Sequence, residues 1–186
     1  MNIQFDEEKH EYWVDGERYP SVTEILTDVG LCQFYGDEWH KKRGNLLHKA
    51  VEMFFKGTLA DAGSFRGHIN QLSNWVRATN AQPLLIEQPL AHQHFKYAGK
   101  PDVVVKTNDG LKVVEIKSGG QHKHYGWQLA AYTLMVKQKF AEDIGMVCLF
   151  IDENSLKAVE FPYSKLEEWL DIIKFYHLKR RYSNGR

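Results

Sequence analysis

The sequence contains only two cysteines, Cys32 and Cys148, which lie far apart along the 186 residues. Two thiols cannot form the disulfide framework that stabilises many small secreted domains. They also cannot supply the four thiolates that hold a typical iron–sulfur cluster. This cysteine usage is typical of a cytoplasmic protein whose thiols stay reduced.

Long apolar runs and an excess of one charge are also missing. No apolar run approaches the roughly 18 residues of a membrane-spanning helix, and the N-terminus lacks the basic start and apolar core of a signal peptide. Lys and Arg number 24, as do Asp and Glu, so the formal net charge is zero. This balance argues against broad affinity for nucleic acid, but it allows a local groove. Short basic segments at residues 41–43, 122–124 and 179–181 are each equally consistent with a solvated surface.

The length and the ordinary 43% hydrophobic content predict one domain, residues 1–186. We expect an N-terminal β-hairpin within residues 1–20, and a capping box at Ser21-Val-Thr-Glu24 that begins a helix. Helices are predicted over residues 22–29, 37–55, 64–79, 125–140 and 164–182, and strands over 84–90, 146–151 and 158–161. Together with a central hairpin, this order predicts an α/β fold with a mixed β-sheet flanked by helices.

The central hairpin is predicted from Asp109-Gly110, which stands between two β-branched runs. Glycine adopts positive φ at no steric cost, so this dipeptide is a strong turn signal. A two-residue loop at these positions pairs Asn108 with Leu111 and places Asp102 opposite Lys117. Residues that are directly opposite in an antiparallel pair point to the same face. A slip of one residue would move Asp102 to the other face.

Glu115 shares the face of Asp102 and Lys117, because it lies two residues before Lys117. Two carboxylates at the diagonal spacing, roughly 7–8 Å or somewhat less between Cβ atoms, can hold one hard cation between them. Valines fill both faces of the two strands, and charges in such a hairpin are costly unless they are paired or metal-bound. This favours a metal-dependent phosphodiesterase over the alternative, an ordinary hairpin with surface charges.

Two helices add polar candidates. His48 lies at the edge of the apolar stripe of its helix, where a packed core histidine is the simpler alternative. Beside two carboxylates it becomes a candidate third ligand, since neutral imidazole binds Mn²⁺-like ions. Gln128 and Tyr132 lie four residues apart on one helix face, and their polar tips could contact a phosphate or a base edge. A structural tyrosine with a satisfied hydroxyl explains that spacing equally well.

In this order, the elements His48, Gly-Lys-Pro-Asp102, Glu115-Ile-Lys117 and Gln128-x-x-x-Tyr132 resemble the PD-(D/E)XK nuclease superfamily. The chain looks most like the RecB-like exonuclease branch. The segment Tyr19-Pro-Ser-Val-Thr-Glu-Ile-Leu26 is similar to the start of mitochondrial genome maintenance exonuclease and of phage-encoded relatives. Each motif alone is weak, but five elements in order at sensible spacings are strong together. The two cysteines separate this chain from members that carry an iron–sulfur cluster.

The resemblance implies a nuclease core and a metal-dependent DNA exonuclease that leaves 5′-phosphate and 3′-hydroxyl ends. It implies a role in DNA recombination, repair or replication. One or two Mg²⁺ or Mn²⁺ ions would be held by Asp102, Glu115, His48 and the backbone carbonyl of Ile116, and Lys117 would complete the catalytic set. The residues expected to bind substrate are Gln128, Tyr132, Ser118, Ser21 and Thr23. Glu87 is a candidate for an additional carboxylate in the site.

The expected partner is DNA, as single strands or duplex ends, with a single-strand annealing or binding protein as a further candidate. No membrane association is expected, and the expected location is the cytoplasm of a bacterium or of a phage-infected host. A structure-selective endonuclease on the same fold is the first alternative. A non-catalytic DNA-binding subunit is disfavoured because both acids and the lysine are retained. A metal-dependent hydrolase of small molecules would need a deep closed pocket, and the sequence leaves that alternative open.

Overall fold

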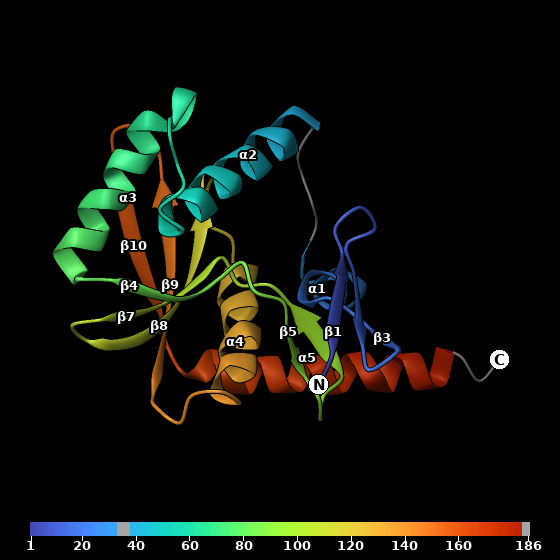
Figure 1. The fold of residues 1–186 in the computed structure, drawn as a ribbon. Helices are drawn as coiled ribbons and strands as arrows, with labels where there is room; N and C mark the ends of the chain where they lie inside the picture. The colour runs from blue at the N-terminus through green and yellow to red at the C-terminus, as the bar shows by residue number, and fades with distance from the viewer. Residues whose placement is uncertain (33–37, 184–186) are drawn as a thin grey trace.

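A five-stranded mixed sheet forms the centre of the protein in a computed structural model (Figure 1). The structure describes residues 1–32 and 38–183. The strand order is β10-β9-β8-β7-β4. The strands are β4 (Gln82–Ile86), β7 (Val103–Thr107), β8 (Gly110–Lys117), β9 (Ile144–Ile151) and β10 (Leu156–Phe161). Strands β8 and β9 run parallel, and the other neighbouring pairs run antiparallel. The predicted α/β architecture with a mixed sheet is confirmed.

Helices cover both faces of this sheet (Figure 1). The helices α2 (Glu38–Phe55) and α3 (Arg66–Thr79) pack on one face, and α4 (His124–Lys137) and α5 (Ser164–Ser183) pack on the other. Alternate strand residues enter the two cores: Val103 and Val105 pack with α2 and α3, whereas Val104 packs with α4 and α5. The charges at the end of these strands are therefore close to two hydrophobic cores.

The N-terminal residues build a smaller layer beside the main sheet. Strands β1 (Ile3–Asp6), β2 (Glu11–Val14) and β3 (Glu17–Tyr19) form an antiparallel sheet, so the predicted hairpin is present and gains a third strand. It packs against a two-stranded hairpin, β5 (Leu90–His92) and β6 (Tyr97–Gly99). The β5–β6 hairpin was not predicted, because its strands have three residues each and the positive φ in its turn, 47°, is adopted by a lysine, Lys96.

The capping box predicted at the start of α1 (Val22–Asp28) is half formed. Ser21 Oγ accepts a hydrogen bond of 3.0 Å from the Glu24 amide, which satisfies one of the free donors at a helix N-terminus. The Glu24 carboxylate accepts instead from the Arg18 guanidinium at 3.0 Å. The side chain of Ile25 anchors the helix in the core that α4 and α5 share.

The other predicted helices lie close to their predicted positions. A short 3₁₀ turn, η1 (Gly63–Phe65), precedes α3, so the predicted helix over residues 64–79 begins as 3₁₀ and continues as α. The predicted start of α2 at Asp37 lies outside the described residues, as does the side chain of Lys41. Among the described helices, none is both long and apolar enough to cross a membrane.

The central hairpin turns earlier than predicted. Its turn residues are Asn108 and Asp109, and Thr107 pairs with Gly110 across the two strands. The Thr107 side chain stabilises this turn: Oγ1 accepts from the Asp109 amide at 3.2 Å and donates to the Gly110 carbonyl at 3.0 Å. The positive φ of Gly110, 111°, falls just after the turn rather than within it.

The predicted register is therefore wrong by two residues. Val103 pairs with Val114, so the strands direct Asp102 toward Glu115 and not toward Lys117. Because the shift is an even number of residues, each side chain keeps the face that was predicted for it.

Candidate active site

The two acids and the lysine meet at the end of the central hairpin that is remote from its turn. Asp102 immediately precedes β7, whereas Glu115 and Lys117 lie in the last residues of β8. Asp102 is 7% exposed and Glu115 is 3% exposed. Carboxylates that are this deeply buried require compensating partners, and the fold supplies a different set to each.

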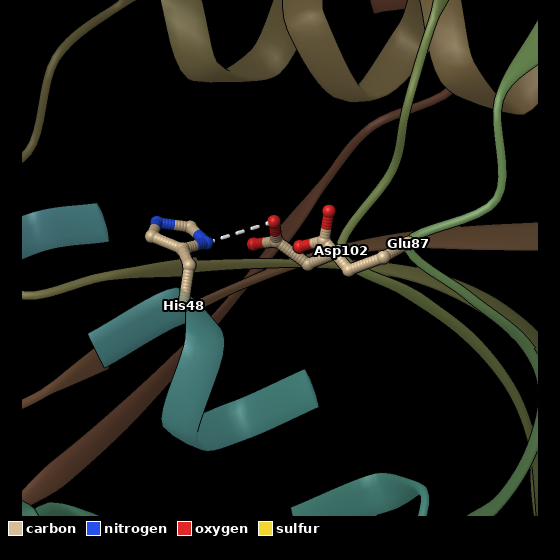
Figure 2. A group of neighbouring side chains, drawn as sticks. All are labelled: His48, Glu87 and Asp102. Carbon is tan, nitrogen blue, oxygen red and sulfur yellow. Dashed lines mark hydrogen bonds and ion pairs between the residues drawn. The ribbon is translucent and has the colours of Figure 1, made fainter. Parts of the chain in front are cut away.

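Asp102 accepts hydrogen bonds at both of its carboxylate oxygens. His48 on α2 lies 2.9 Å away through Nδ1 (Figure 2). The Ile116 amide donates to the other oxygen at 2.6 Å. Burial alone would raise the pKa of Asp102, but His48, together with Lys117 and the Ile116 amide, lowers this pKa below its usual value. The same charge on Asp102 raises the pKa of His48 to about 9. This pair is thus an ion pair at neutral pH.

Glu115 has an unequal pair of oxygens. Its Oε1 accepts from Lys117 Nζ at 2.7 Å and from Gln128 Nε2 at 3.0 Å. Its Oε2 is buried and has no hydrogen-bond partner within the described part of the chain. Burial and the charge of Asp102 raise the pKa of Glu115 to about 7. A buried carboxylate with a free oxygen can accept either a proton or a cation.

Lys117 stays positively charged although it is largely enclosed. Burial would lower its pKa, but the charges of Glu115 and Asp102 raise this pKa above its usual range. Its Nζ also lies 4.9 Å from the centre of the Tyr125 ring, a cation–π distance. The ammonium group is therefore fixed between a carboxylate and an aromatic face.

Glu87 joins His48 and Asp102 in a group that can hold a metal ion. One ligand atom from each of these three residues lies within 4.8 Å of the other two (Figure 2). Two carboxylates and an imidazole suit Mg²⁺ or Mn²⁺, and the free Oε2 of the neighbouring Glu115 is a further unused oxygen. As the side chains stand, Glu115 is bonded to Lys117 and does not belong to this three-residue group.

Local backbone strain positions Glu87. Its φ of 48° lies in the left-handed region, which costs a non-glycine residue about 1–2 kcal/mol. The Glu87 amide donates to the Asp102 carbonyl at 3.0 Å, and the Glu87 carboxylate pairs with Lys100 at 2.6 Å. Burial and then Asp102 raise the pKa of Glu87. The turn after β4 thus directs a third acid to the ligand group at an energetic cost.

Gln128 and Tyr132 lie behind Glu115 and not on an open surface. Both are buried on α4, and Gln128 Nε2 lies 3.0 Å from Glu115 Oε1 and 3.1 Å from Tyr132 Oη. A Cβ atom at Gly99 would lie 2.6 Å from the Tyr132 ring, so glycine allows the ring to pack against β6. In this arrangement the motif fixes the Glu115 side chain, whereas contact with a phosphate or base was expected.

The remaining predicted residues lie around this centre. Ser21 and Thr23 lie at the N-terminus of α1, where their hydroxyl oxygens are 3.1 Å apart and Ser21 caps the helix. Ser118 is exposed directly after Lys117 and lines a cavity of about 460 Å³ together with Arg43 and His68. The structure thus brings the acids, the lysine, the histidine and Gln128 together, and places the three hydroxyl residues outside that group.

Three neighbours of the site were not predicted. Lys100 lies within the Gly-Lys-Pro-Asp102 motif, and its position close to a predicted ligand could have indicated an ion-pair partner for Glu87. Tyr125 and Cys148 gave no comparable signal. Cys148 is the β9 partner of Glu115 in the parallel register, and burial followed by the Glu115 charge raises its pKa to about 12. This thiol is a buried packing group and not a reactive one.

A protein-family model matches residues 63–184, about two thirds of the chain. The matching model describes the PD-(D/E)XK nuclease superfamily. The chain belongs to this superfamily. The matched range includes Glu87, Asp102, Glu115 and Lys117, and His48 lies before it.

A solved structure with a TM-score above 0.5 shows the same fold. A protein named as a putative exonuclease from Eubacterium rectale superposes with a TM-score of 0.51 at 11% sequence identity, over 87% of this chain and 73% of that chain. At this identity the likeness concerns the fold. The structure of SSO0001 gives a TM-score of 0.34 at 14% identity, over 83% of each chain. No curated protein sequence matches the chain.

Proposed function

We propose that this protein is a metal-dependent DNA exonuclease of the RecB-like branch, which hydrolyses phosphodiester bonds and leaves 5′-phosphate and 3′-hydroxyl ends. The observation that carries the proposal is the convergence of Asp102, Glu115 and Lys117, with His48 on the first acid and a free buried oxygen on the second. Membership of the superfamily supports metal-dependent nuclease activity. A role in DNA recombination, repair or replication, with a single-strand annealing or binding protein as partner, is part of the same proposal.

Two ligand groups around Asp102 would hold the cofactor, Mg²⁺ or Mn²⁺. Asp102, Glu115, His48 and the Ile116 carbonyl would form one group, and Glu87 would extend it to a second ion. Such an ion, when bound, lowers the pKa of a water molecule and neutralises charge that develops on the phosphate. Both histidine and carboxylate must give up their protons to bind it, so His48 and Glu115, whose pKa values are raised, would release protons on binding.

Lys117 would act on the phosphate itself. An ammonium group has three N–H donors, and Lys117 uses one of them on Glu115. The others can orient the attacking water or donate to a phosphate oxygen, where negative charge builds up in the transition state. Because Glu115 and Asp102 keep the pKa of Lys117 high, its ammonium group would stay charged during the reaction.

Gln128 and Tyr132 would serve the reaction indirectly. Gln128 Nε2 donates a hydrogen bond to Glu115 Oε1 and another to Tyr132 Oη. These bonds would restrict the rotation of the Glu115 carboxylate and leave its second oxygen free to bind an ion. They are positioning residues in this proposal, together with the α4 backbone that carries them.

Digestion of linear single-stranded and duplex DNA, labelled at one end, tests the proposal. With Mg²⁺ we expect product length to fall progressively with time, activity to stop with EDTA, and Mn²⁺ to restore it. Closed circular single-stranded DNA is the control, since cutting a circle requires an endonuclease. Cleavage that survives exhaustive chelation would exclude the metal mechanism, and rapid cutting of the circle would exclude the exonuclease assignment.

A further inference from the structure

A cluster of aromatic rings lies directly beside Lys117. His122 and His124 stack on one another, with ring centres 5.4 Å apart and planes 18° from parallel. Tyr125 meets both rings edge to face, at 5.4 Å from His122 and 4.5 Å from His124. The mechanism proposed above uses none of these three rings.

The platform, as we call His122, His124 and Tyr125, is connected to the reaction centre by direct contact. Lys117 Nζ lies 4.9 Å from the Tyr125 ring centre, and the Tyr125 amide donates to the His122 carbonyl at 3.2 Å. A nucleotide whose phosphate lies at Lys117 can therefore place its base on these rings. The platform is part of the same surface as the catalytic lysine.

The approach to the platform is open. His122 is exposed, whereas His124 and Tyr125 are half-buried beneath it. The chain between Lys117 and His122 contains Gly119 and Gly120, and a Cβ added to either glycine would meet nothing within 4 Å. The loop between the lysine and the outermost ring is therefore not crowded by other side chains at these two positions.

The inner ring of the stack is uncharged at neutral pH. Burial, followed by the neighbouring His122 and Lys117, lowers the pKa of His124 to about 4. The inner ring therefore adds no positive charge to the stack. The half-buried inner rings also hold the exposed ring in place, so little conformational freedom is lost when a base binds.

The balanced charge of the whole chain favours a contribution to affinity from stacking. With 24 basic and 24 acidic residues, the protein lacks the excess positive charge with which many proteins bind the DNA backbone. Stacking on an aromatic ring contributes roughly five- to 150-fold in affinity per base, and it tolerates any sequence. A base within a duplex has its faces covered by neighbouring bases, so the ring selects an unpaired nucleotide.

We propose that the His122–His124–Tyr125 platform binds the base of an unpaired nucleotide next to the scissile phosphate, which makes a single-stranded DNA end the preferred substrate. This inference rests on the proposed nuclease function and adds the strand preference to it. His122 is the specificity-determining residue, because it presents the exposed ring.

The test measures DNA binding separately from cleavage. Binding of a fluorescent single-stranded oligonucleotide is measured by anisotropy in EDTA, and cleavage is measured with Mg²⁺. We expect His122→Ala to weaken single-strand binding about tenfold and to raise KM with kcat nearly unchanged. His122→Phe, which keeps a flat ring but no imidazole, should restore binding to within about twofold. Binding to a blunt duplex should stay the same in both variants.

His94→Ala is the matched control, since His94 is also an exposed histidine that meets an aromatic ring, Phe95, edge to face. An oligonucleotide with an abasic terminal nucleotide should bind wild type as weakly as it binds His122→Ala. Equal single-strand binding by wild type and His122→Ala would overturn the platform, as would failure of His122→Phe to restore it. Single-strand binding that depends on His122 in a protein without Mg²⁺-dependent cleavage would support the platform and refute the nuclease assignment.

Discussion

Asp102 accepts hydrogen bonds at both carboxylate oxygens, from His48 and from the Ile116 amide, and its pKa is lowered. Glu115, its neighbour across the strands, has one oxygen bonded to Lys117 and Gln128 and one buried oxygen without a partner in the described chain, and its pKa is raised to about 7. Two carboxylates of similar burial thus have opposite electrostatic surroundings.

This difference indicates that the two acids have different roles, one in the folded structure and one in function. The fold stabilises the charge on Asp102 without any ion, whereas it leaves the charge on Glu115 incompletely compensated. A divalent cation would supply the missing positive charge next to the free oxygen of Glu115. We infer that Asp102 orders the site in the metal-free protein and that Glu115 makes the site dependent on metal.

The largest expected effect on activity comes from removing the ammonium group of Lys117, which is bonded to Glu115. Lys117→Ala should reduce Mg²⁺-dependent DNA cleavage by about 10³-fold or more, because the phosphate loses its charged donor in the transition state. Lys106→Ala is the matched control, since Lys106 lies in β7 near the turn, where its ion pair with Glu142 is exposed. Circular dichroism should show an intact fold for both variants. Full activity in Lys117→Ala would refute the role of this lysine.

Substitution of each acid by its amide should change stability in opposite directions. In EDTA at about pH 8, Asp102→Asn should destabilise the protein by about 3 kcal/mol, because His48 loses the charge that it pairs with. Glu115→Gln should stabilise it by roughly 2–3 kcal/mol, because the amide resembles the protonated acid that the fold prefers. Thermal unfolding measures both changes. A comparable loss of stability in the two variants would remove the contrast between the acids.

The pH dependence of stability in EDTA should sharpen the same contrast. The pKa of Glu115 is raised from 4.5 to about 7, so its contribution to stability is full below about pH 4.5 and is lost as pH rises through 7. The pKa of His48 is raised from 6.5 to about 9, so its contribution is full below about pH 6.5 and is lost as pH rises through 9. The melting temperature should therefore fall in two stages. Glu115→Gln should reduce the first stage, to which Glu87 also contributes because its pKa is raised, and should leave the second stage unchanged. A single stage in wild type would contradict this assignment.

A smaller effect is expected from the residues that hold Glu115. Gln128→Ala should lower kcat/KM about tenfold, as expected for the loss of a hydrogen bond to a charged group. Tyr132→Phe should lower it only a few-fold, because the hydroxyl acts through Gln128 and the ring still packs on Gly99. Steady-state cleavage of end-labelled DNA measures both. An effect of Tyr132→Phe larger than that of Gln128→Ala would indicate that the hydroxyl contacts DNA itself.

The sequence predicted those features that depend on local patterns. Apolar stripes and end signals placed the helices within a few residues, and Ser21 begins α1 as its capping motif predicted. The valine runs predicted strands buried on both faces, because such runs have no solvent-facing side. The family resemblance related His48 to Asp102, although 54 residues separate them.

The features that were missed depend on side-chain and backbone interactions that sequence patterns do not specify. The register of the central hairpin follows from the hydrogen bonds of the Thr107 side chain, which compete with the turn that Asp109-Gly110 favours. The position of Glu87 follows from strained backbone and from Lys100. Sequence spacing specifies neither contact, so the proximity of Glu87, a predicted additional carboxylate, to His48 and Asp102 became evident only in the folded chain.

Anomalous diffraction from crystals soaked with Mn²⁺ would show directly whether Glu115 binds the metal, because it locates the ion among the acids. We expect a peak in contact with both Asp102 and Glu115, with the Glu115 oxygen that is now free as a ligand. A peak bound only by His48, Glu87 and Asp102, with Glu115 still bonded only to Lys117 and Gln128, would contradict this role of Glu115.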